Sequence, residues 1–110
     1  MMKAQTCARV IFPEGFDERG AFEMSLKGWL SARVELTDGR HYSVYFIDPV
    51  RLRQDLDENA QRGRPYLADP GLIVLPEVTV EAVQEAVHAL CEEGFFARLR
   101  AEQENERAAI

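Results

Sequence analysis

Three residues whose types could support catalysis, Glu35, His41 and Ser43, lie close together around a predicted hairpin turn. With a three-residue turn at Thr37–Gly39, Glu35 stands opposite His41, and Ser43 follows on the same strand face. A serine hydrolase needs the hydroxyl within reach of the imidazole, together with donors for an oxyanion. Strand geometry separates the serine and histidine backbones by ~7 Å, and no glycine-rich donor loop or nucleophile elbow adjoins them. We therefore expect a cross-strand Glu–His pair and no catalytic residue.

The second histidine and the two cysteines are the remaining candidates for a metal site. His88 lies on the polar side of a predicted helix with Glu81 and Glu92, which could hold a divalent cation weakly. A zinc site needs three or four convergent ligands, and the chain has two histidines. Cys7 and Cys91 match no metal-ligand spacing, and two free thiols are typical of the cytoplasm. We expect no metal and no cofactor.

A group of arginines resembles an anion site by composition alone. Its members are Arg51, Arg53, Arg62 and Arg64. Acidic residues share the same predicted helix, and Glu58 with Arg62 is a favourable i,i+4 pair. The Arg62-Gly63-Arg64 segment lacks the glycine spacing and the Lys-Ser/Thr ending of a phosphate loop. A salt-bridged surface helix is therefore the main prediction, and anion binding is the alternative.

Trp29 provides the strongest signal of a binding surface. From Phe22 to Leu36 every even position is apolar or glycine, and Trp29 is the large apolar residue among the odd positions. The three-residue turn places Trp29 opposite Ile47, with Tyr45 diagonally beside it on the solvent face. Clustered apolar side chains on such a face mark contact surfaces. We predict Trp29, Tyr45 and Ile47 as partner-binding residues; the alternative is that the N-terminal strand or the C-terminal segment covers them.

Length and charge limit the classes of protein and partner. A chain of 110 residues with 46% apolar residues is expected to form one domain over 1–96, followed by a solvated helical or frayed tail over 97–110. A net charge of −6 disfavours nucleic-acid phosphates and anionic membranes. No apolar run approaches the ~20 residues of a membrane span, and no secretory signal is visible. We expect a cytoplasmic protein.

The strands must position these residues. A short edge strand is predicted over 8–12, before a ribbon over 22–36 with a bend or bulge at Gly28. A two-residue turn would bring His41 to the core face, whereas a three-residue turn with a left-handed Gly39 gathers the apolar residues of both strands on one face. We choose the three-residue turn. Residues Leu72–Leu75 read as a further strand covered on both faces.

The helices have clear start and stop signals. Asp48 should cap a surface helix that runs from Pro49 to about Arg62, and Thr79 should cap a second helix that stops at Gly94. The second helix has a predicted buried stripe of Val80, Val83, Val87, Leu90 and Cys91.

The order β-β-β-α-β-α indicates a two-layer α+β fold. We expect a mixed β-sheet of three or four strands, built from a long β-hairpin and one further strand, with helices on one face. The expected function is a non-enzymatic cytoplasmic interaction module, an adaptor, regulator or inhibitor that binds protein or a second copy of itself as a homodimer. The alternative is a small-molecule-binding protein or enzyme subunit with a pocket near the 64–71 loop.

Overall fold

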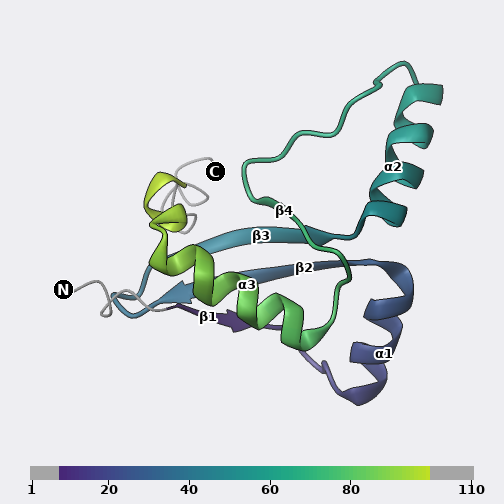
Figure 1. Ribbon diagram of the computed structural model, residues 1–110. Coiled ribbons are helices and arrows are strands. Elements are labelled where there is room, and N and C mark those ends of the chain that lie inside the picture. The colour runs from purple at the N-terminus through teal and green to yellow at the C-terminus, as the bar shows by residue number, and fades with distance from the viewer. Residues whose placement is uncertain (1–7, 100–110) are drawn as a thin grey trace.

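The computed structural model describes residues 8–99, which form a mixed sheet with helices against one face and at one end (Figure 1). The elements are β1 (Ala8–Ile11), α1 (Glu18–Lys27), β2 (Trp29–Leu36), β3 (His41–Ile47), α2 (Pro49–Gln61), β4 (Leu72–Val74), α3 (Val80–Glu92) and the 3-10 helix η2 (Phe95–Arg98). The strand order is β1-β2-β3-β4. The first two pairs are antiparallel and β4 is parallel to β3, which confirms the α+β class and the mixed sheet.

The first half of the predicted 22–36 ribbon is wrong, because these residues belong to helix α1. The Asp17 side chain caps the helix by accepting a hydrogen bond from the Gly20 backbone N–H at 2.9 Å. At the other end Gly28 takes a left-handed φ of +79°, and its N–H donates to the Met24 carbonyl at 2.9 Å. Good capping at both ends favours the helix over the two-residue alternation. The predicted bend at Gly28 is therefore a helix end.

The helix also reverses the expected burial of two side chains. Met24 is buried, as the alternation predicted, whereas Phe22 and Leu26 are exposed. In a helix, residues four apart share a face and a residue two away points nearly opposite. Phe22 and Leu26 consequently form a ridge on the side of α1 that faces away from the core.

The hairpin between β2 and β3 has the predicted register. Glu35 is paired with His41, and the Leu36 backbone N–H donates to the Arg40 carbonyl at 2.9 Å across a three-residue turn. Gly39 has a φ of +93°, the left-handed conformation that this turn needs. The register places one apolar face of the hairpin in the core: Leu30, Ala32, Val34, Leu36, Tyr42, Val44 and Phe46.

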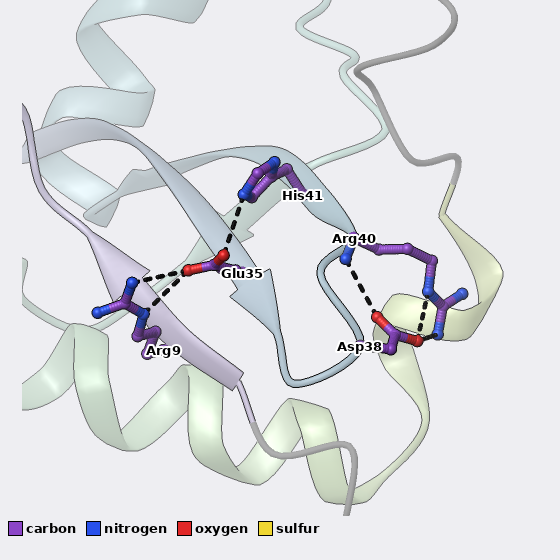
Figure 2. Close-up of polar contacts among 5 residues, drawn as sticks. All are labelled: Arg9, Glu35, Asp38, Arg40 and His41. Carbon is purple, nitrogen blue, oxygen red and sulfur yellow. Dashed lines mark hydrogen bonds and ion pairs between the residues drawn. The ribbon is translucent and has the colours of Figure 1, made fainter.

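Local polar contacts hold the tip of this hairpin (Figure 2). The Asp38 carboxylate accepts hydrogen bonds from the Arg40 backbone N–H at 3.1 Å and from its Nε at 2.8 Å. This bonding lowers the pKa of the Asp38 carboxyl and raises the pKa of the Arg40 guanidinium. Asp38 and Arg40 thus neutralise each other on either side of Gly39, where the chain reverses direction.

The two later helices begin at the predicted caps. The Asp48 carboxylate accepts from the Arg51 backbone N–H at 2.8 Å, and the Thr79 hydroxyl accepts from the Ala82 backbone N–H at 3.1 Å. Helix α2 has no buried residue, as expected of a surface helix. Helix α3 lies across the core face of the sheet, whereas α1 and α2 stand at one end of it (Figure 1).

The predicted stripe of α3 divides into two levels of burial. Three of its members are buried, and Val80 and Leu90 are partly buried against the core. The strand predicted over Leu72–Leu75 was expected to be covered on both faces. This part of the prediction is wrong, because Val74 is half exposed. Strand β4 is an edge strand, so its outward side chains have a neighbouring strand on one side only. Cys7 and most of the predicted 97–110 tail lie outside the described residues, and η2 occupies the start of that segment.

Candidate functional site

The predicted aromatic pair is present on the outer face of the sheet, opposite α3. Trp29 is paired with Ile47, and the Trp29 and Tyr45 ring centroids are 5.8 Å apart with a tilt of 42°. Both rings are partly buried. Partial burial raises the pKa of the Tyr45 phenol, and the Asp55 carboxylate raises it further. These two side chains form a joined aromatic surface.

Ile47 departs from its predicted role as a contact residue. Its side chain is fully buried, although it lies outside the main core cluster. It sits between Trp29 on β2 and Val74 on β4, and α2 begins two residues later. Paired strands thus flank it on both sides. Ile47 therefore supports the aromatic pair from within the sheet.

Two cations flank the Trp29 indole. The Lys27 ammonium lies 5.5 Å from the ring centroid, and the Arg51 guanidinium carbon lies 5.7 Å from it. Arg51 is itself fixed, because its Nε donates to the Asp55 carboxylate at 2.9 Å. Cations at this range are attracted to the indole and restrict its motion. Trp29 is thus positioned by the last residue of α1 and the first turn of α2.

The sequence interpretation missed four further apolar residues at this end of the sheet. They are Phe22 and Leu26 on α1, Val50 on α2 and Val74 on β4, with exposed fractions of 64%, 70%, 68% and 50%. Helix α1 ends here, β2 and α2 begin here, and β3 and β4 end here (Figure 1). We call these four residues with Trp29 the apolar end. For Phe22 and Leu26, the sequence signal was the pair of helix caps at Asp17 and Gly28 together with the i,i+4 spacing of the two residues.

Small side chains leave a hollow beside the aromatic pair. A depression of about 260 Å³ is lined by Ser31, Ser43, Val44, Tyr45 and Asp69. A wider and shallower one of about 530 Å³ shares Ser31 and Ser43 and extends to Phe12 and Pro13, just beyond β1. The outer face is therefore recessed next to Tyr45, where a protruding side chain of a partner could enter.

The Glu35, His41 and Ser43 set gains a fourth member in the structure. The Glu35 carboxylate lies 3.3 Å from His41 Nε2, and Arg9 on β1 donates to it at 2.8 and 3.0 Å (Figure 2). Hydrogen bonding from Arg9, with a smaller contribution from His41, lowers the pKa of Glu35. The carboxylate is thus shared between a permanent cation and an imidazole. The expected cross-strand pair is present as part of a three-strand ionic cluster.

The other titratable candidates form local pairs. His88 Nε2 lies 3.2 Å from the Glu92 carboxylate one turn along α3, and both side chains are well exposed. Within residues 8–99 no three His, Cys, Asp or Glu side chains converge as a metal site would require. On α2, Arg51 and Arg53 form i,i+4 ion pairs. Asp55 and Asp57 therefore neutralise the charges of these two arginines.

Comparison with known proteins found no matching family model, no similar curated protein and no similar solved structure.

Proposed function

We propose that this protein is a small non-enzymatic interaction module, an adaptor, regulator or inhibitor, that binds protein through the apolar end and the adjoining Tyr45 surface. One observation carries the proposal: the elements that meet at one end of the sheet, where Trp29 lies, carry four further large apolar side chains, each at least half exposed. Elsewhere on the described outer face the exposed strand residues are polar, among them Ser31, Arg33 and Ser43, and the apolar Ile11 and Leu72 are partly buried. Several large apolar side chains exposed at one end of a molecule are characteristic of a contact site.

The aromatic pair is suited to the centre of such a contact. Trp and Tyr contribute disproportionately to interface energies. Trp29 is already held by Lys27, Arg51 and the supporting Ile47, so little side-chain freedom remains to be lost on binding. We expect the exposed apolar side chains of α1 and α2 to supply surrounding surface that excludes water from the contact.

A second copy of this chain is the partner that we propose first. A two-fold symmetric dimer needs a single suitable surface, and such dimers are the commonest oligomers. The net charge of −6 opposes association, but at physiological salt the Debye length is about 8 Å and separated charges are screened. A different protein is the other partner to be tested. None of the helices in residues 8–99 is long and apolar enough to cross a membrane.

Sedimentation equilibrium over a concentration series tests this proposal. The wild type should self-associate, and Trp29→Ala should weaken assembly by about 2 kcal/mol, or roughly thirtyfold, while leaving the fold intact. Phe22→Ser with Leu26→Ser should weaken it as well. Tyr66→Ala is the matched control, because Tyr66 is an exposed aromatic beyond the far end of α2, about 20 Å along that helix.

Circular dichroism confirms that each variant is folded before assembly is compared. A wild type that stays monomeric and shows no Trp29-dependent binding to a protein of its native host contradicts the proposal. An equal effect of Tyr66→Ala contradicts the location of the surface.

The alternative function, a small-molecule-binding protein, is favoured by a separate observation. A pocket of about 210 Å³ lies at the end of α2 and the start of the loop that follows it. It lies away from the apolar end, so the two sites can act independently.

A further inference from the structure

The end of α2 is fixed by a specific helix-stop geometry. Gly63 has a left-handed φ of +83°, the Arg64 N–H donates to the Asn59 carbonyl at 2.8 Å, and the Gly63 N–H donates to the Ala60 carbonyl at 3.0 Å. These two bonds define a Schellman motif, which satisfies carbonyls at the negative end of the helix. Arg62 and Arg64 flank the glycine that reverses the chain. Both arginines are thus placed at the same helix end by local backbone bonding.

The loop that follows is held against this helix end. The Tyr66 N–H donates to the Arg64 carbonyl at 2.7 Å, an i to i+2 bond around Pro65, whose ring favours the φ of an inverse γ-turn. The Asn59 side-chain amide donates to the Tyr66 carbonyl at 3.0 Å. The Arg64 guanidinium carbon lies 5.7 Å from the Tyr66 ring centroid. Hydrogen bonds and a cation–π contact therefore order the loop.

These residues enclose a pocket with a mainly polar lining. Its volume is about 210 Å³, and it is lined by Asn59, Arg62, Arg64, Tyr66, Leu67 and Ala68. Unlike Arg51 and Arg53, neither Arg62 nor Arg64 forms an ion pair with a carboxylate of residues 8–99, so the expected Glu58–Arg62 pair is not formed there. Two arginines thus line one small pocket, and neither has an ion-pair partner in the part of the chain that the structure describes.

We infer that this pocket binds the phosphoryl group of a small phosphate monoester. A planar guanidinium presents a fork of N–H donors that matches phosphate oxygens, and two such groups suit a dianion. The cation–π contact of Arg64 with the Tyr66 ring uses none of the guanidinium N–H groups in a hydrogen bond, so they remain available to donate to a ligand. The more than half-exposed Tyr66 ring offers a surface for a flat group attached to the phosphate.

The site differs from a phosphate loop in the source of its donors. Backbone N–H groups of Gly63, Arg64 and Tyr66 are used within the turn, so the side chains of Arg62 and Arg64 provide the binding. The acidic net charge of the chain weakens long-range attraction for anions. Its effect at the pocket is limited because screening acts over about 8 Å at physiological salt.

Titration of the folded protein with inorganic phosphate and with adenosine monophosphate tests the inference, with ionic strength held constant by sodium chloride. Backbone amide resonances of residues 59–68 should shift and saturate with at least one of the two ligands. Arg62→Ala and Arg64→Ala should each weaken binding about tenfold or more, since each removes charge-assisted hydrogen bonds. Arg53→Ala is the matched control, because it makes the same charge change on the same helix at a residue paired with Asp57.

Tyr66→Leu distinguishes the two sources of phosphate. If it weakens adenosine monophosphate and leaves inorganic phosphate unchanged, the ligand carries a flat ring on Tyr66. If it changes neither, the site takes the phosphoryl group alone. Shifts that fail to saturate with either ligand, or equal weakening by Arg53→Ala, overturn the inference. None of these readouts depends on self-association or on Trp29.

Discussion

Gly28 joins three elements of this fold, and a methyl group added to it should be strongly destabilising. A Cβ on Gly28 would lie 2.6 and 2.7 Å from the two Asp48 carboxylate oxygens. That carboxylate caps α2 by accepting from the Arg51 N–H at 2.8 Å, and the Asp48 N–H donates to the Gly28 carbonyl at 2.9 Å. The end of α1, the start of β2 and the start of α2 therefore meet at this glycine.

Two contributions set the expected magnitude for Gly28→Ala. Holding alanine in the left-handed conformation at a φ of +79° costs about 1–2 kcal/mol. Displacing the Asp48 carboxylate from its capping position costs about 0.5–2 kcal/mol more. The variant should lose about 1.5–4 kcal/mol of unfolding free energy. In a continuous strand over 22–36, the same change would instead stabilise the protein by about 0.5–1 kcal/mol.

Urea denaturation followed by far-UV circular dichroism measures this effect. Gly39→Ala is the control for the backbone contribution alone, because Gly39 has a φ of +93° and no atom lies within 4 Å of the place that a Cβ would take there. Asp48→Ala removes the cap, and combining it with Gly28→Ala should cost less than the sum of the two single changes. If Gly28→Ala is neutral or stabilising, Gly28 does not end α1 in a left-handed conformation. A cost equal to that of Gly39→Ala would refute the collision with Asp48.

Further predictions concern burial and pH. Phe46→Ala, at a fully buried position, should cost about 3–5 kcal/mol in urea denaturation, whereas Phe22→Ala should change stability by less than about 0.5 kcal/mol. Similar costs for both would contradict the exposed face of α1. Hydrogen bonding from Arg9 lowers the folded-state pKa of Glu35 below its ordinary value of 4.5, so its stabilisation is present above that pH and is lost as the pH falls through the lower folded value. Glu35→Gln should therefore be less stable than wild type at neutral pH, with a difference that shrinks in denaturation curves below pH 4.5; a constant difference would contradict this cause.

The hairpin register and the caps of α2 and α3 were predictable from the sequence because each depends on a few neighbouring residues. Gly39 permits the turn, and only one turn length brings all the apolar positions of the hairpin to one face. Asp48 and Thr79 cap helices through N–H groups three residues away.

The α1 segment shows where local pattern was ambiguous. Alternating apolar residues over 22–26 also place Phe22 and Leu26 four apart, which is the spacing of one helical face. The pattern alone did not favour the helix over the strand, and the caps at Asp17 and Gly28 were the better guide.

Sequence by itself determined the turns, the helix caps and the apolar face of the hairpin, since these follow from hydrogen bonds and steric limits within a few residues. Tertiary structure decided which side of each element is covered. Met24 is buried and Phe22 exposed because one side of α1 packs against the rest of the fold. Ile47 is buried between neighbouring strands, and Glu35 meets Arg9 only because β1 pairs with β2. Burial and long-range pairing depend on elements far apart in the chain, and no local pattern records that arrangement.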